Sequence, residues 1–266
     1  MKVHVLIENT KPIGSAYLSE HGLCLYFEHG RNRILYDTGA SDKFIYNATL
    51  LGIDLSKVNI CVLSHGHYDH TGGLAHFLDI NKKAKVYMRE AATRELYSKK
   101  LTRYVYTGMP KGVFERYKDR ITFVDEDTEI AKGITLSTIN KSRNYPRYTS
   151  SMYYNENGEM RHDDLSHELF VNVKTDRGNV VLSGCSHHGL LNVLKTAEKK
   201  FGRVYGVAGG FHLNGTKIFG IRVKRESKHE IRSIARYFER NNVKKIYTGH
   251  CTGEKPLEKL KLLSRT

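Results

Sequence analysis

The chain contains no tryptophan and has only four prolines and four cysteines among its 266 residues. The cysteines, Cys24, Cys61, Cys185 and Cys251, lie far apart without a CxxC pair, so a zinc knuckle is not expected. There is no Ser/Gly-rich stretch, low-complexity tract or repeat of fixed period that would mark a linker. We therefore expect one domain over residues 1–266.

Long apolar runs are also missing. No stretch of about 18 apolar residues is present, and the apolar start of the sequence ends at Glu8. Neither a membrane span nor a secretory signal is expected, and so we predict a cytoplasmic protein with reduced thiols and no membrane partner.

Acidic residues are few: 28 Asp and Glu stand against 43 Lys and Arg, which gives a formal net charge of +15. Such a charge attracts anionic ligands, either phosphorylated metabolites or nucleic acid. Lysine pairs such as 82–83 and 199–200 also fit an ordinary solvated surface, which is the reading we favour. We expect an anionic small-molecule substrate and, without a flexible basic arm, no nucleic-acid partner. A homo-oligomer is left open.

The apolar pattern predicts an α/β fold. Strands are expected over residues 2–7, 23–27, 33–36, 59–63, 85–88, 169–173, 179–182, 204–207 and 244–247. Helices are expected over residues 44–51, 71–77, 91–100, 190–200 and 231–240. The pattern weakens over about 101–164, part of which is rich in Tyr and Arg, and this segment is interpreted as an excursion that forms either a lid or a mobile loop.

The strand expected at 59–63 runs into the motif HGHYDH, residues 65–70. Loops at strand tips carry functional side chains in open α/β sheets. Gly66 allows a tight turn that points His65 and His67 to one side and leaves Asp69 and His70 for a second position. Imidazole and carboxylate suit zinc, manganese or iron, and the spacing favours two cations over one.

Three more predicted strands end in histidine motifs: GCSH (184–187), GGFH (209–212) and TGHC (248–251). The glycines before His212 would let a substrate approach the backbone, where His212 could donate a proton or bind phosphate; a structural histidine is the alternative. Isolated histidines are expected in ordinary surface or hydrogen-bonding roles: His4, His21, His29, His76, His162 and His229.

The motif HxHxDH after an apolar strand, preceded by LYDTG (35–39), resembles the metallo-β-lactamase superfamily. The resemblance implies an α/β fold of four layers, an αβ/βα sandwich with two mixed β-sheets flanked by helices and the metals at one edge. It also implies two divalent metal ions, of which zinc is favoured over manganese, iron or magnesium. Asp37 would then support the site from behind, where an outer acceptor orients a ligating imidazole; a turn-forming aspartate is the alternative.

The superfamily usually supplies a later histidine, a bridging aspartate and a terminal histidine, and His250 fits the terminal position. Where the aspartate is usual, this chain has Cys185. Either His187 is a ligand or Cys185 bridges as thiolate; we favour His187, because a free cysteine often only packs. The predicted metal ligands are His65, His67, Asp69, His70, His187 and His250, with Cys185 as the alternative. Catalytic roles are assigned to Asp69 and His212.

Together the motifs resemble a subfamily of dihydropterin–ribofuranosylaminobenzene 5′-phosphate synthases. This implies transfer of a dihydropterin methyl group from its diphosphate to β-ribofuranosylaminobenzene 5′-phosphate, with release of pyrophosphate. Hydrolysis of a phosphoester or other ester is the alternative, and a nuclease or an inactive binding protein is less favoured. Besides His212, Tyr148 and Tyr154 are predicted to contact the substrate, because tyrosines stack on flat pterin or arylamine rings.

Overall fold

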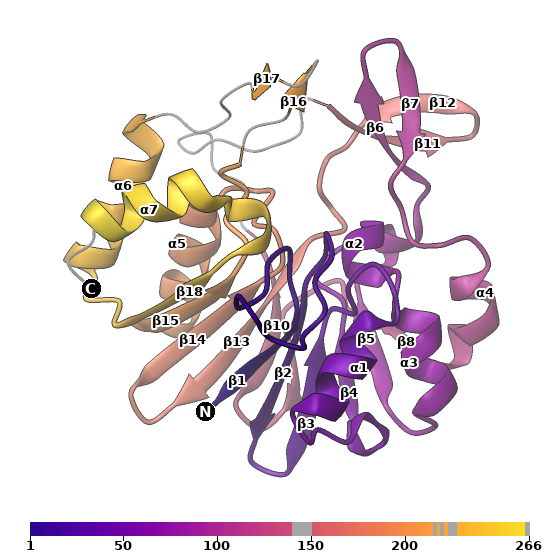
Figure 1. Cartoon of the computed structure of the whole chain (residues 1–266), viewed down its shortest axis with the longest axis horizontal. Helices are drawn as coiled ribbons and strands as arrows, with labels where there is room; N and C mark the ends of the chain where they lie inside the picture. Colours follow the sequence, from indigo (N-terminus) through magenta and orange to yellow (C-terminus); the bar gives the residue numbers. More distant parts are fainter. Residues whose placement is uncertain (140–150, 215–216, 219–220, 223–227, 264–266) are drawn as a thin grey trace.

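The computed structural model describes residues 1–139, 151–214, 217–218, 221–222 and 228–263. Two six-stranded sheets pack face to face, and helices cover the outer face of each sheet (Figure 1). This arrangement confirms the predicted αβ/βα four-layer sandwich.

The first sheet has the strand order β1-β2-β3-β4-β5-β8. Its strands are Val3–Ile7, Cys24–His29, Asn32–Tyr36, Ile60–Val62, Lys85–Met88 and Ile121–Phe123. Strands β1 to β3 pair antiparallel, and β3, β4, β5 and β8 pair parallel. Parallel pairing brings the carboxyl ends of β3 and β4 to one edge of the sheet.

The second sheet has the order β18-β15-β14-β13-β10-β9. Its strands are Lys245–Thr248, Val204–Gly209, Gly178–Ser183, Leu169–Thr175, Ile134–Thr138 and Thr128–Ala131. Strands β14, β15 and β18 are parallel, so the three later histidine motifs follow strands that end at the same edge. The strands predicted over 169–173 and 179–182 correspond to β13 and β14, which pair antiparallel as a hairpin.

Alternating side chains explain why the sheets are buried on both faces. In β2, Leu25 and Phe27 face the second sheet, while Cys24 and Tyr26 face the helices. Such doubly apolar strands are typical of a sheet that is covered on both sides. Fully burying one side chain of the size of Phe27 contributes roughly 1.5–3 kcal/mol.

Helices α1, α3 and α4 accompany the first sheet and α5, α6 and α7 the second; a short α2 lies at the edge (Figure 1). In chain order they are Lys43–Leu50, Tyr68–Thr71, Leu74–Ile80, Val113–Tyr117, Leu190–Phe201, Lys228–Arg240 and Glu254–Leu263. Among the helices of the described residues, none is both long and apolar enough to cross a membrane.

A third sheet projects from the sandwich and has the order β12-β11-β6-β7 (Figure 1). Its strands are Glu159–His162, Met152–Glu156, Leu96–Lys100 and Arg103–Tyr106. The predicted helix over 91–100 is therefore wrong: a 3₁₀ turn, Glu90–Thr93, leads into strand β6. Pairing of Tyr97 with Tyr106 and Tyr153 stabilises the strand, because cross-strand aromatic contacts outweigh local helix propensity.

The segment 101–164, expected as an excursion, contributes to the main body as well. It supplies β8 to the first sheet and β9 and β10 to the second, while β7, β11 and β12 join the projecting sheet. Tyr154 lies in β11, and Tyr148 lies outside the described residues. A two-stranded hairpin, Lys217–Ile218 with Ile221–Arg222, completes the described strands.

Candidate metal centre

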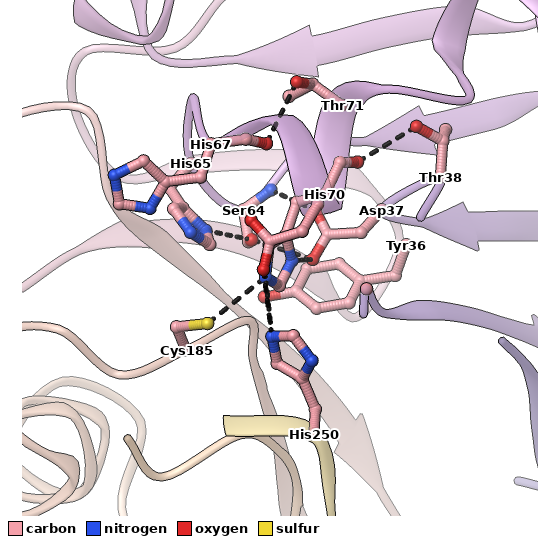
Figure 2. A network of polar contacts seen from close by, with 12 residues as sticks. Tyr36, Asp37, Thr38, Ser64, His65, His67, His70, Thr71, Cys185 and His250 are labelled. Carbon is pink, nitrogen blue, oxygen red and sulfur yellow. Dashed lines mark hydrogen bonds and ion pairs between the residues drawn. The ribbon is translucent and has the colours of Figure 1, made fainter. Parts of the chain in front are cut away.

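Histidines from loops that are far apart in the sequence converge at one edge of the sandwich (Figure 2). The loop after β4 brings the HGHYDH motif, and the loops after β14 and β18 bring Cys185 and His250. Most of the side chains that meet there are buried, with 0% exposure for His65 and His70 and 4% for His250.

Glycines fix the path of the HGHYDH motif by close approach to neighbouring backbone. A side chain on Gly66 would place its Cβ 2.6 Å from the carbonyl oxygen of Ala92, and one on Gly73 would lie 2.2 Å from that of Thr38. The backbone N–H and the hydroxyl of Thr38 both donate to the carbonyl of His70, at 2.8 and 3.0 Å. The motif is therefore anchored on the loop that follows β3.

Asp37 lies directly behind the histidines and is fully buried. Its Oδ1 accepts from the backbone N–H of Ser64 at 2.7 Å, and its Oδ2 accepts from the Ser64 hydroxyl at 2.8 Å and lies 2.7 Å from Nδ1 of His70. Because the hydroxyl of Ser64 donates to Asp37, it accepts from Nδ1 of His65, 2.8 Å away. In their neutral forms His65 and His70 thus carry hydrogen on Nδ1, and the lone pair of Nε2 faces the centre.

One group of ring nitrogens comes from His65, His67 and His187. Nε2 of His187 lies 3.3 Å from Nε2 of His65 and 3.2 Å from Nδ1 of His67. In a tetrahedral zinc site with Zn–N bonds of about 2.05 Å, ligand nitrogens are about 3.3 Å apart. The three nitrogens therefore match the spacing of imidazoles that share one cation.

A second group comprises Asp69, His70 and His250. Nε2 of His70 lies 3.2 Å from Nε2 of His250, and Oδ2 of Asp69 lies 3.7 and 3.4 Å from these two atoms. Nδ1 of His250 lies 2.8 Å from Oδ1 of Asn9, which also accepts from the backbone N–H of Gly22 at 3.3 Å. The Gly22 N–H identifies this Asn9 atom as the oxygen, so Nδ1 of His250 carries the hydrogen and its Nε2 faces the centre with a lone pair.

Cys185 lies between the two groups. Its Sγ is 3.2 Å from Nε2 of His70. It belongs to three sets of metal-ligand atoms within 4.8 Å of one another: one with His65 and His187, one with His70 and His250, and one with His212 and Cys251. The structure brings both His187 and Cys185 to the centre, and the choice of His187 as the ligand stays a prediction. Burial raises the pKa of the Cys185 thiol well above its usual value.

The two groups differ in electrostatics. Burial lowers the pKa of His67 to about 3 and holds those of His65 and His187 well below the usual value. Burial also acts to lower the pKa of His70, but the carboxylates of Asp37 and Asp69 outweigh it and raise that pKa to about 9. The first group consequently offers neutral imidazoles, and the second attracts positive charge.

His212 lies beside the first group, with its ring centroid 4.4 Å from that of His187. Its backbone N–H donates to Sγ of Cys251 at 3.2 Å. The two glycines before His212 are expected to let a substrate approach the backbone, but their surroundings indicate another reason. A Cβ at Gly209 would lie 1.6 Å from the carbonyl oxygen of Ser183, and one at Gly210 would lie 2.4 Å from the sulfur of Cys251. These glycines are required by packing of the strand tip.

Backbone strain is concentrated in the same loops. Asp37, Ser186, His212 and His250 have φ values of 59°, 55°, 50° and 49°, in the left-handed region that favours glycine. Non-glycine residues in this region cost on the order of 1–3 kcal/mol each, and such strain tends to cluster at functional sites.

Two buried acids, Glu168 and Asp163, hold the loops around the first group, and neither stands in a motif. The carboxylate of Glu168 accepts from the backbone N–H groups of His187 and His188, at 2.7 and 2.9 Å, and contacts Nδ1 of His188 at 2.7 Å. His188 is thereby engaged by Glu168. His167 contacts Asp163 at 2.9 Å, and its Nδ1 accepts from the N–H of Gly66 at 3.3 Å.

His21, expected in an ordinary surface or hydrogen-bonding role, also contacts the second group. Its Nε2 lies 3.3 Å from Oδ2 of Asp69, and its ring stacks on that of His250 with centroids 5.3 Å apart. Its side chain is 58% exposed, so it lies at the solvent side of the second group. Neither His21 nor its partner Asn9 belongs to a recognisable motif.

Comparison with known proteins gives consistent matches. A sequence profile described as the metallo-β-lactamase superfamily matches residues 20–143. The 7,8-dihydropterin-6-methyl-4-(β-D-ribofuranosyl)-aminobenzene-5′-phosphate synthase of Methanocaldococcus jannaschii is 30% identical, over 96% of this chain and 88% of that protein. A second, uncharacterized protein of that organism is 28% identical over 98% of this chain and 94% of its own.

Solved structures give the same result for the fold. The crystal structure of a metal-dependent hydrolase of the β-lactamase superfamily is 31% identical and has a TM-score of 0.80, covering 98% of this chain and 92% of that one. YhfI of Bacillus subtilis, a metallo-β-lactamase fold protein, has a TM-score of 0.57 at 12% identity over the same shares of both chains, so it indicates the fold alone.

Proposed function

Because the chain belongs to the metallo-β-lactamase superfamily, we propose that it is a two-cation metalloenzyme that acts on a phosphorylated small molecule. Within that class, the proposed reaction is transfer of a dihydropterin methyl group from its diphosphate to an arylamine, with release of pyrophosphate. The relative that is 30% identical over 96% of the chain is named as a synthase of the product that such a transfer would form.

The contact between His70 and His250 is the observation that supports a cation centre most strongly. Asp37 and Asn9 place the hydrogens of the two rings on Nδ1, so two lone pairs face each other at 3.2 Å. Two lone pairs at this distance repel each other unless a proton or a cation lies between them. The carboxylate of Asp69 beside them adds the negative charge that a divalent cation requires.

The residues fit two cation positions. His65, His67 and His187 would hold one cation, and Asp69, His70 and His250 the other, with Cys185 reaching both. When bound, such cations neutralise charge on a diphosphate leaving group and, in hydrolysis, make a water more acidic. Zinc is the proposed metal, because imidazole, carboxylate and thiolate together suit it.

The chain's own side chains would bind and orient the substrate beside this centre. His212 packs against His187 and is the proposed contact for the phosphorylated part. Tyr154 is the proposed contact for a flat ring: it pairs with Leu96, whose side chain approaches Gly66, and the guanidinium of Arg94 lies 4.7 Å from its ring. The face of the projecting sheet that carries Tyr154 thus adjoins the HGHYDH turn.

Pyrophosphate release tests the proposed reaction. Zinc- or manganese-loaded protein is mixed with a dihydropterin methyl diphosphate, with and without β-ribofuranosylaminobenzene 5′-phosphate, and pyrophosphate is measured. We expect release that depends on the arylamine. Release that is equally fast without it contradicts transfer, and absence of release from cation-loaded protein contradicts this substrate.

Hydrolysis is a second candidate, favoured by one comparison. The metal-dependent hydrolase with a TM-score of 0.80 is as similar in sequence as the synthase, at 31% identity. A panel of phosphomonoesters, phosphodiesters and carboxylic esters distinguishes the two, since a hydrolase turns over at least one of them without an acceptor.

A further inference from the structure

We propose that Asn9 and His21, on the loop between β1 and β2, are positioning residues that select the second cation position, formed by Asp69, His70 and His250. The inference rests on the proposed two-cation centre. It assigns to this loop a role that no metal-ligand motif of the sequence indicates.

The carboxamide of Asn9 contacts two imidazoles at once. Its oxygen accepts from Nδ1 of His250 at 2.8 Å and from the N–H of Gly22 at 3.3 Å. Its amide nitrogen must then face Nδ1 of His21, 3.2 Å away, and donate to it. A single side chain thus decides which nitrogen carries the hydrogen in both rings.

The two rings receive opposite tautomers. In His250 the hydrogen is on Nδ1, which leaves Nε2 as a ligand atom toward His70. In His21 the lone pair of Nδ1 accepts from Asn9, so the hydrogen is on Nε2. The Nε2 atom that carries it lies 3.3 Å from Oδ2 of Asp69, so the positive end of the N–H bond is close to the carboxylate. His21 is therefore placed as an outer partner of a ligating carboxylate and not as a ligand itself.

The loop between β1 and β2 also contacts the backbone of His250. The carboxylate of Glu8 also contacts it: Oε2 of Glu8 accepts from the backbone N–H of His250 at 3.1 Å. The ring of His21 stacks on that of His250 at an interplanar angle of 29°. The hydrogen bonds of Glu8 and Asn9 with His250, the stacking of His21 on His250 and the contact of His21 with Asp69 make the loop a support for the second position specifically.

The first position has separate supports. Ser64 contacts His65, and Glu168 holds the backbone of His187. Changes at Asn9 or His21 should therefore affect the affinities of the two cations unequally. This asymmetry separates a positioning role from a general effect on folding.

The test is a zinc titration against a competing chelator, which resolves two affinities per chain. For Asn9→Leu we expect one of the two affinities to fall by about 10–100-fold, as for other outer partners of metal ligands, while the other changes by less than about threefold. Asn9→Asp keeps an acceptor for Nδ1 of His250 and should retain most of the affinity. Equal affinities in wild type and Asn9→Leu would overturn the inference.

His21 has a matched pair of variants. His21→Gln can still donate an N–H toward Asp69, whereas His21→Leu cannot, so only His21→Leu should weaken the second cation. His162→Leu, on the projecting sheet, is the control and should bind as wild type does. Equal loss in His21→Gln and His21→Leu would contradict a donor role.

A second measurement does not depend on variants or on activity. In protein with ¹⁵N-labelled histidine, long-range ¹H–¹⁵N correlation spectra report the tautomer of each ring. We expect the Nε2–H form for His21 and the Nδ1–H form for His250; the opposite forms, or a zinc-bound nitrogen in His21, would overturn the proposal. If the wild type binds fewer than two cations, the proposed function fails; if it binds two and Asn9→Leu is unaffected, only this inference fails.

Discussion

Nε2 of His70 and Nε2 of His250 lie 3.2 Å apart although 180 positions separate the two residues in the sequence. Each ring has its other nitrogen engaged by an outer oxygen, that of Asp37 for His70 and that of Asn9 for His250. The hydrogen-bond pattern around the rings thus prepares a site for a positive ion between them. The following predictions depend on this arrangement.

Asp37→Asn should weaken cation binding by about 10–100-fold, because an amide cannot accept at all the places where the carboxylate now does. Cation content after dialysis against a chelator measures the effect. Asp125→Asn, an exposed carboxylate 3.6 Å from Arg89, is the control and should retain its cations. If Asp37→Asn retains them equally well, Asp37 does not orient the ligands.

Cys185 should be a direct ligand. In cobalt-substituted protein we expect a near-ultraviolet thiolate-to-cobalt absorption band, which Cys185→Ser abolishes. Cys24 is the matched control: it is also fully buried, but it faces the helices that cover the first sheet, so Cys24→Ser should keep the band. A band that survives in Cys185→Ser would leave Cys185 as a packing residue.

Cation binding should release a proton from His70. Its pKa in the cation-free chain is raised to about 9, since the carboxylates of Asp37 and Asp69 outweigh the effect of burial. A cation at Nε2 displaces that proton, so affinity at this position should rise by up to about tenfold per pH unit between about pH 6.5 and 9. Calorimetry in two buffers of different ionisation enthalpy measures the proton; no release at pH 7 would contradict the assignment.

The same shift predicts how the stability of the cation-free chain depends on pH. A raised pKa in the folded state means that the folded chain binds the proton more tightly than the unfolded chain does. The stabilisation is fully present below about pH 6.5 and is lost as the pH rises through about 9. Thermal unfolding of the chelator-treated protein should show the decline, which His70→Gln should remove from this pH range.

Tyr154→Ala should raise the KM for an aromatic substrate more than for a small phosphoester, because only the former stacks on the ring. Tyr104→Ala is the matched control. Tyr104 pairs with Lys99 and packs against Tyr153, on the face of the projecting sheet opposite to Tyr154. Equal changes in KM for both substrates, or in both variants, would remove the case for stacking.

The sequence predicted the sandwich and most of its strands, because strands that are buried on both faces appear as short apolar runs bounded by turns. It failed at Leu96–Lys100, where local composition favours a helix but contacts with Tyr106 and Tyr153 stabilise a strand. Contacts between distant segments do not appear in a local pattern.

For the centre, the sequence indicated the side chains that stand in motifs and one outer partner, Asp37, but not Asn9 or His21. His21 and Asn9 reach the second group only because the loop after β1 folds against the loop after β18. The sequence also could not show that both His187 and Cys185 reach the centre, because side chains two positions apart on one loop can point in different directions. Side chains that act through others carry no spacing signal of their own.

The number of zinc ions bound per chain is the most direct test of a two-cation centre. Zinc is measured in wild type, in His187→Ala and in His250→Ala after removal of loosely bound metal, with folding checked by circular dichroism. We expect two zinc ions in wild type and about one in each variant, because each substitution removes a ligand from one group only. Wild type that holds one zinc ion or none when saturated would contradict a two-cation centre.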